Sequence, residues 1–207
     1  KATGIAIDAR VYAIKVLSSS GMGTEASLIA GIEWAIDNNV DIINMSLGSD
    51  YASEAEEEIC SIAYEQGMSI VAAAGNDGIE KYSYPASYPM VVSVAAVDQD
   101  NNRAYFSNKN DMLSIAAPGV DIYSALPNNE YGIYSGTSMA TPHCTGSLAI
   151  AKEYYLNLGK KNPSNEYLET VMQSTALPKN DYNSYGAGIL QAYDLLKAIE
   201  NEMLRKK

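Results

Sequence analysis

The sequence is poor in cysteine, in histidine and in positive charge. Its two cysteines, Cys60 and Cys144, are too few for a disulfide framework, and each lies among apolar residues on an expected helix. We interpret both as buried free thiols, which weakly favours a reducing compartment. His143 is the only histidine in the chain, so the sequence offers a single imidazole for any catalytic role.

Basic residues are outnumbered by acidic ones, 14 to 25, which gives a formal net charge of −11. An acidic surface disfavours nucleic acid and anionic membranes, because phosphate contacts need clustered lysine and arginine. Long apolar runs are also missing, and no segment reaches the roughly 18 apolar residues of a transmembrane helix. We therefore expect neither nucleic acid nor a membrane among the partners.

Short apolar runs alternate with amphipathic segments, a pattern typical of a parallel sheet with crossover helices. The expected strands are residues 11–16, 41–45, 69–74, 91–97, 104–106, 113–117 and 122–125. The expected helices are residues 25–38, 54–65, 138–158, 164–174 and 191–205. The length of 207 residues and the 47% hydrophobic content predict one α/β domain over residues 1–207.

The octapeptide GTSMATPH at 136–143 places Ser138 at the start of an expected helix. Unpaired N–H groups and positive partial charge at a helix N-terminus would favour an oxyanion beside this serine, although an ordinary N-cap serine gives the same pattern. His143 follows five residues later, which on a helix means about 7.5 Å of rise and about 140° of rotation. The two side chains then face apart, so His143 is expected to be structural and not the base for Ser138.

Two other glycine-containing segments, MSLG at 45–48 and AAAGN at 72–76, follow expected strands. Ligands of parallel α/β sheets bind beyond the carboxyl ends of the strands. Gly48 and Gly75 would leave backbone exposed there for an extended peptide to pair with. Asn76 would add an amide donor that suits a developing oxyanion, while a simple turn at residues 76–78 remains the alternative interpretation.

Several segments together resemble one family, the subtilisin-like serine proteases or subtilases. The similar segments are GTSMATPH at 136–143, NMSLG at 44–48, AAAGN at 72–76, YPASYP at 84–89, AVDQDNNRAYFS at 96–107 and APG at 117–119. They follow the family's order over essentially the whole chain. The resemblance implies a three-layer α/β fold with a mainly parallel sheet flanked by helices, incomplete at its N-terminal side.

The resemblance also implies roles for individual residues in peptide-bond hydrolysis. Ser138 would be the acylating nucleophile, and Asn76 would stabilise the oxyanion together with the Ser138 N–H group. The implied substrate-binding residues are Ser20, Gly21, Met22, Ser46, Leu47, Gly48, Ala73, Ala74, Gly75 and Ser83. Among these, Ser83 would lie near the floor of the primary pocket, where a small residue leaves room for medium-to-large apolar side chains.

No cofactor is expected for catalysis, because the resemblance implies chemistry carried by side chains alone. A structural calcium ion is compatible with the family. The backbone carbonyls of Ala86, Tyr88 and Val91 match a position at which some members bind a weak cation.

The sequence departs from the family in one decisive respect. The family's aspartate motif, D-[ST]-G, and its histidine motif, HGTH, are both absent, and residues 9–17 resemble the segment that follows the histidine helix. Removing triad members costs on the order of 10⁴–10⁶ in turnover, so this chain alone is expected to be nearly inactive. We expect the aspartate and histidine to come from a segment upstream of Lys1, carried on the same product or on an associated fragment.

Two alternatives remain open at this point. The chain could be a truncated product, or a catalytically inactive pseudoprotease that binds peptides or a partner protein. The complete octapeptide around Ser138, together with Asn76, favours the enzyme, because a binding scaffold has no need of both. The compartment also stays open: the family implies export, whereas the acidic balance and the unpaired cysteines resemble its cytoplasmic branch.

Overall fold

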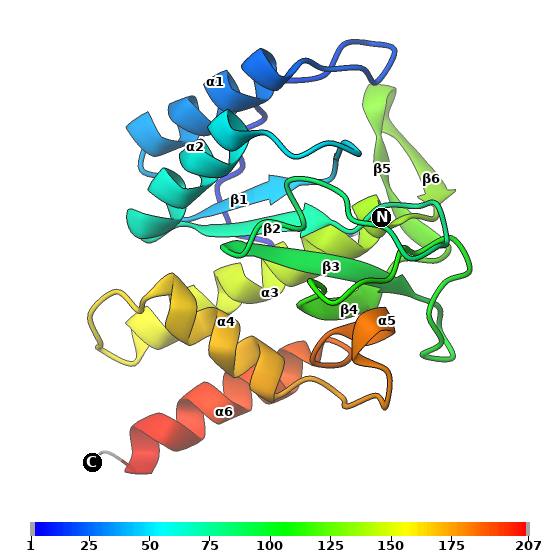
Figure 1. Cartoon of the computed structure of the whole chain (residues 1–207). Coiled ribbons are helices and arrows are strands. Elements are labelled where there is room, and N and C mark those ends of the chain that lie inside the picture. The colour runs from blue at the N-terminus through cyan, green and yellow to red at the C-terminus, as the bar shows by residue number, and fades with distance from the viewer. Residues whose placement is uncertain (1–2, 206–207) are drawn as a thin grey trace.

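The computed structural model describes residues 3–205 and has a parallel four-stranded sheet at its centre. The strands lie side by side in the order β1 (Ile42–Met45), β2 (Ser69–Ala73), β3 (Val91–Val97) and β4 (Ile115–Pro118) (Figure 1). β2 and β3 are buried along their whole length, which explains their nearly continuous runs of small and apolar residues. Because all four strands are parallel, their carboxyl ends share one edge of the sheet.

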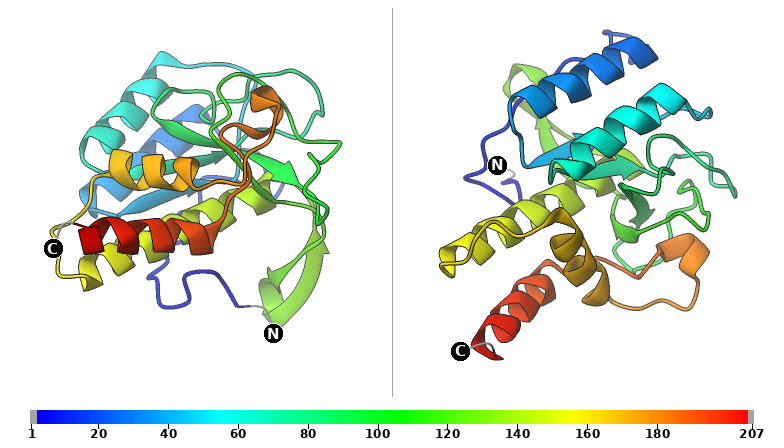
Figure 2. Two further views of the ribbon diagram at one scale, coloured as in Figure 1. Left: turned by 90° about the horizontal axis from the view of Figure 1, so that it is seen from below. Right: turned by 60° about the vertical axis from the view of Figure 1, so that its left-hand side comes forward.

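Helices cover both faces of the sheet, as the two further views in Figure 2 also show. One face carries α1 (Glu25–Asp37) and α2 (Glu54–Glu65). The opposite face carries α3 (Thr137–Asn157), α4 (Asn165–Ser174) and α6 (Ala192–Arg205). Separate clusters of buried apolar residues fill the two interfaces, and the short α5 (Tyr182–Tyr185) contacts β4. The expected α/β fold, with a mainly parallel sheet between layers of helices, is confirmed.

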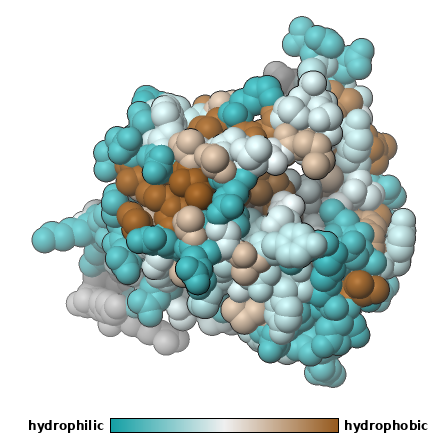
Figure 3. Space-filling view, turned by 45° about the horizontal axis from the view of Figure 1, so that its top comes forward, coloured by the Kyte–Doolittle hydropathy of each residue, from teal (hydrophilic) through white to brown (hydrophobic). Residues whose placement is uncertain are grey.

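The first two helices begin at the residues that the sequence indicates; α2 also ends as expected, whereas α1 ends one residue before the expected Asn38. The Thr24 hydroxyl accepts a hydrogen bond from the Ser27 N–H group at 3.1 Å and caps α1. The Ser53 hydroxyl accepts from the Glu56 N–H group at 3.3 Å and caps α2. Gly67 follows α2 with a φ of +88°, the left-handed conformation that ends many helices. Figure 3 views the face formed by these two helices, where hydrophilic side chains surround smaller apolar areas.

A two-stranded antiparallel hairpin stands apart from the main sheet (Figures 1 and 2). It consists of β5 (Ile122–Leu126) and β6 (Glu130–Tyr134), joined by a 3₁₀ turn at Pro127–Asn129. The sequence predicts β5 but misses β6. Asn128 and Asn129 both adopt positive φ values, 64° and 60°. The two adjacent asparagines after Pro127 were therefore the available sequence signal for a hairpin turn.

Two predicted strands are wrong. Residues 11–16 form no strand, and Val11 is 83% exposed. A strand persists only where a neighbour completes its hydrogen bonds, and this segment instead lies against α1, where the Tyr12 and Trp34 rings are 5.4 Å apart. Residues 104–106 also form no strand, because this segment turns back onto the end of β3, with the Ala104 N–H group donating to the Ala96 carbonyl at 2.8 Å.

A buried carboxyl group on α4 has a perturbed pKa. The side chain of Glu169 is buried, and its Oε1 atom has no hydrogen-bond partner among residues 3–205. Desolvation raises the pKa of Glu169 to about 7, against the opposing effect of a hydrogen bond from Ser69. A folded-state pKa above the unfolded value means that Glu169 adds stability below pH 4.5 that is lost as the pH rises through about 7.

We therefore predict that Glu169→Gln stabilises the protein above neutral pH. The variant removes the cost of ionising a buried group, so its free energy of unfolding at pH 8.5 should exceed that of the parent by about 2–3 kcal/mol. At pH 4.5 the difference should nearly vanish. Thermal unfolding across this pH range measures both values, and Glu58→Gln, on the exposed side of α2, is the matched control. An equal effect of Glu169→Gln at both pH values would contradict the burial argument.

Candidate active site

Ser138 lies in the first turn of α3, at the edge formed by the carboxyl ends of the strands. Pro142, one turn later, has no N–H group to donate to the Ser138 carbonyl. The Ser46 hydroxyl donates to that carbonyl instead, at 2.9 Å. In return the Ser138 hydroxyl donates to the Ser46 carbonyl at 3.3 Å. This reciprocal pair fixes the N-terminus of α3 against the loop that follows β1.

Asn76, in the loop that follows β2, is held by the residue before the serine. Its Oδ1 atom accepts hydrogen bonds from the Thr137 N–H group at 2.8 Å and from the Thr137 hydroxyl at 3.0 Å. Its Nδ2 group therefore points away from Thr137, and it has no acceptor among residues 3–205. The Ser138 N–H group also lacks an acceptor in this part of the chain. The site thus holds two unpaired N–H donors at the positive end of a helix dipole, next to a hydroxyl.

Asn108 supports the loop that carries Asn76. Its backbone N–H donates to the Gly75 carbonyl at 3.0 Å, and its Oδ1 atom accepts from the N–H groups of Asp77 at 2.8 Å and Gly78 at 3.1 Å. The Asn108 side chain is fully buried. Gly75 has a φ of +101°, and a Cβ atom built there would lie 2.4 Å from Asn108 Nδ2, so both conformation and space require glycine.

A cavity of about 220 Å³ opens beside Ser138. Its lining residues are Leu47, Gly48, Asp50, Ala73, Gly75, Asn76, Asp77, Ser83, Thr137 and Ser138. Most of the residues that the sequence assigns to the nucleophile, the oxyanion donor and the primary pocket are brought together here. The sequence did not indicate Asp50, Asp77 or Thr137, because loop carboxylates and a threonine in a helix's first turn resemble ordinary solvent-facing and capping residues.

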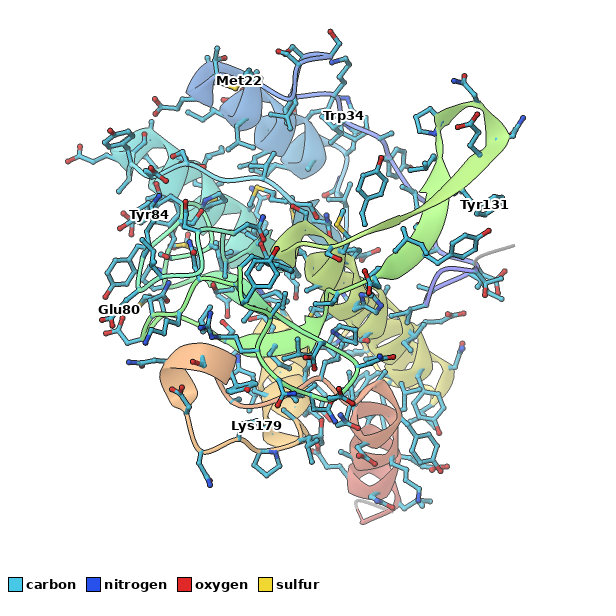
Figure 4. All side chains as sticks on the ribbon, turned by 90° about the vertical axis from the view of Figure 1, so that its right-hand side faces the viewer. Met22, Trp34, Glu80, Tyr84, Tyr131 and Lys179 are labelled. Atoms are coloured by element: carbon cyan, nitrogen blue, oxygen red, sulfur yellow. The ribbon has the colours of Figure 1, made fainter. Side chains whose placement is uncertain are left out.

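Other expected site residues lie outside this cavity. Ser46 contacts Ser138 but does not line the cavity, and Ala74 is buried in a neighbouring part of the core. Ser20, Gly21 and Met22 form a turn before α1, closed by the Ser18 N–H group donating to the Met22 carbonyl at 2.8 Å. Met22 is 72% exposed, and Figure 4 places it next to the start of α1.

His143 does not contact Ser138. Its Nδ1 atom lies 2.9 Å from the Met139 carbonyl, one helical turn back along α3. The Ser138 hydroxyl has no imidazole or carboxylate partner among residues 3–205, and its hydrogen bond goes to the Ser46 backbone. The described part of the chain therefore supplies a hydroxyl and two unpaired N–H donors, but no base in contact with the hydroxyl.

The described residues contain no group of three or more histidine, cysteine, aspartate or glutamate side chains arranged to hold a metal ion. Ala86, Tyr88 and Val91, the expected cation ligands, are buried just before or at the start of β3. The Tyr88 carbonyl already accepts the Val91 N–H group at 3.0 Å. None of the helices over residues 3–205 is long and apolar enough to cross a membrane.

Comparison with known proteins relates this chain to proteases. Residues 1–188 match the family described as the subtilase family. The chain is 42% identical to subtilisin DY of Bacillus licheniformis, covering 90% of this chain and 68% of that protein. It is 41% identical to an alkaline protease of Alkalihalobacillus alcalophilus, covering 91% of this chain but only 48% of the relative. The chain thus spans about half to two thirds of these curated relatives.

Solved structures agree with the sequence matches. The prenylagaramide maturation protease PagA superimposes with a TM-score of 0.82 at 31% identity, covering 88% of this chain and 70% of the other. The self-cleaved protease domain of PatA superimposes with a TM-score of 0.88 at 30% identity, covering 96% of this chain and 77% of the other.

We predict that Asn108→Ala destabilises the protein by about 2–4 kcal/mol, because it removes a buried side chain that accepts hydrogen bonds from the Asp77 and Gly78 N–H groups. Denaturant unfolding measures this free energy. The matched control is Asn157→Ala at the exposed C-terminal end of α3, where a change within about 0.5 kcal/mol is expected. Equal effects of the two substitutions would show that Asn108 does not support the loop.

Proposed function

Since this chain belongs to the subtilase family, we propose that it carries the nucleophile and the oxyanion donors of a serine endopeptidase. One observation supports this most strongly: Thr137 holds Asn76 by its Oδ1 atom, which leaves Asn76 Nδ2 and the Ser138 N–H group unpaired beside the Ser138 hydroxyl. Unpaired donors next to a nucleophile are what acyl transfer requires, because negative charge develops on the substrate carbonyl oxygen.

The proposed reaction begins with attack of Ser138 Oγ on the carbonyl carbon of the scissile peptide bond. The carbonyl oxygen becomes an oxyanion and accepts hydrogen bonds from Asn76 Nδ2 and the Ser138 N–H group. A base takes the Ser138 hydroxyl proton during the attack and gives it to the leaving amine as the C–N bond breaks, and the acyl-enzyme on Ser138 remains until water hydrolyses it. The Ser138 hydroxyl must turn away from the Ser46 carbonyl, its partner at 3.3 Å, toward a base.

That base is proposed to come from outside the described residues. We propose that a segment upstream of Lys1, or an associated fragment, supplies the histidine and the aspartate of the triad. His143 cannot take this role, because its Nδ1 atom is engaged with the Met139 carbonyl, one turn back along α3, and not with Ser138. A substrate in extended conformation would lie between the Ser46–Gly48 segment on one side and the Ala73–Gly75 segment and Ser83 on the other, with Ser20, Gly21 and Met22 on the opposite edge.

A second candidate function is a catalytically inactive subtilase that binds peptides or a partner protease. The observation in its favour is that the Ser138 hydroxyl donates to the backbone of Ser46 and contacts no base among residues 3–205. The same cavity and the same unpaired donors would bind a peptide carbonyl without hydrolysing the bond.

A structural cation is a separate proposal. The carbonyls of Ala86, Tyr88 and Val91 would supply three neutral oxygens with no carboxylate among them, half or fewer of the roughly six to eight that calcium takes. Such a set fits only a weakly held cation whose remaining ligands are water. Catalysis itself is proposed to need no cofactor.

We predict that Ser138→Ala abolishes peptide hydrolysis by the full-length gene product and also its labelling by a fluorophosphonate. Asn76→Ala should lower kcat by about 10²–10³, the range measured for such a donor in subtilisin itself, with little change in KM. Ser174→Ala, at the exposed end of α4, is the control and should leave both readouts unchanged. Peptide binding without turnover or labelling in the full-length product would favour the inactive regulator instead.

A further inference from the structure

Two acidic residues are among those that line the cavity beside Ser138. Asp50 comes from the loop that follows β1, and Asp77 directly follows Asn76 in the loop after β2. Both line the same cavity as the Ser138 side chain. If this cavity holds the substrate side chain next to the scissile bond, as the proposed function requires, these two residues face that side chain.

Lys81 forms an ion pair with each of the two carboxylates. Lys81 Nζ is 2.8 Å from Asp50 Oδ1 and 3.2 Å from Asp77 Oδ2, yet Lys81 does not line the cavity. Asn108 Nδ2 donates to the same Asp77 oxygen at 3.2 Å. The cluster of Asp50, Asp77 and Lys81 therefore has a net charge of −1, and of its three residues Asp50 and Asp77 line the cavity.

Both carboxylates are held in place, and Asp77 stays ionised. The hydrogen bond from Asn108, and then the contact with Lys81, hold the pKa of Asp77 below its usual value. Asp50 and Asp77 in turn raise the pKa of Lys81, so this lysine remains charged. Asp77 and Lys81 therefore keep their opposite charges over the ordinary pH range.

The other residues that line the cavity suit the aliphatic part of a substrate side chain. Leu47, Gly48, Ala73 and Ser83, which also line the cavity, are apolar or small. A Cβ atom built on Gly48 would lie 2.4 Å from Ser83 Oγ, so no larger residue can stand there without displacing Ser83. A side chain that combines a methylene stem with a cationic head matches this wall, since the stem contacts the small residues and the head meets the carboxylates.

We propose that this cavity selects a lysine or arginine side chain on the substrate residue that contributes the scissile carbonyl. Asp50 and Asp77 are the specificity-determining residues, and Lys81 is a positioning residue that holds them and moderates their charge. The inference rests on the proposed function. It replaces the apolar preference that the small residue at Ser83 suggests, because the expectation from Ser83 alone did not include the two carboxylates.

The expected effect of the two carboxylates on the rate constant depends on how far their side chains are exposed to water. The side chains of Asp50 and Asp77 are 58% and 48% exposed, so water and salt screen them. One unit charge at contact distance in such surroundings changes a rate constant about fivefold to tenfold at low ionic strength. The preference should therefore weaken as salt is added, whereas a preference based on shape would not.

The test uses the full-length gene product and three fluorogenic peptides that differ only in the residue before the scissile bond: lysine, norleucine or glutamate. We expect kcat/KM to decrease in that order. Asp77→Asn should lower the lysine-to-norleucine ratio about fivefold to tenfold, and Lys81→Met should raise it. Asp37→Asn, the same charge change at the exposed C-terminal end of α1, should leave the ratio unchanged. Because both kcat/KM values are measured on the same variant, the lysine-to-norleucine ratio does not depend on how much of that variant is folded.

Separate outcomes test the inference and the proposed function. Hydrolysis that favours norleucine over lysine, with a ratio that neither Asp77→Asn nor Lys81→Met moves, overturns the inference and leaves the protease intact. No hydrolysis of any of the three peptides contradicts the proposed function. Binding of the same peptides to Ser138→Ala, measured by fluorescence anisotropy, then decides the selectivity of the cavity: tighter binding of the lysine peptide supports it, and equal binding overturns it.

Discussion

The site depends on the contact between the N-terminus of α3 and the loops that follow β1 and β2. Hydrogen bonds from Thr137 to Asn76, and the reciprocal pair between Ser46 and Ser138, join three segments that are distant in sequence. Pro142 makes the second contact necessary, because it leaves the Ser138 carbonyl without its helical donor. Because Thr137 occupies the acceptor end of Asn76, the donor end of that amide is directed elsewhere. The hydrogen bonds made by the first turn of α3 therefore leave the Asn76 Nδ2 donor unpaired beside the Ser138 hydroxyl.

The sheet and most helices could be predicted from the sequence. The segments whose structure was predicted wrongly are those that depend on contacts with residues distant in the sequence. The runs at β2 and β3 are apolar because both faces of these strands are covered, and Thr24 and Ser53 mark helix starts by local capping. Residues 11–16 have the same apolar character but no ladder partner, so composition alone misleads there. The strand β6 was missed because its exposed residues carry no alternating pattern.

The candidate site likewise contains some residues that could be predicted from the sequence and others that depend on contacts between distant segments. Ser138 and Asn76 stand in recognisable segments, so their proximity could be expected from sequence. Asn108 could not be found this way, because its role arises from hydrogen bonds to a loop about 30 residues away, at Asp77 and Gly78. The pairing of Lys81 with Asp50 and Asp77 is likewise a property of two loops that meet only in the folded chain. Side-chain identity in these segments indicates the proposed reaction, whereas the proposed preference for a basic substrate side chain depends on loop geometry.

The central claim is that Asn76 Nδ2 and the Ser138 N–H group bind the oxyanion together. The most direct measurement is a crystal structure of the full-length product inactivated by a peptidyl phosphonate on Ser138. The account predicts a phosphonyl oxygen within about 2.7–3.1 Å of both nitrogen atoms, in the same geometry as a tetrahedral intermediate. A phosphonyl oxygen directed to solvent, with neither Asn76 Nδ2 nor the Ser138 nitrogen within hydrogen-bonding distance, would contradict it.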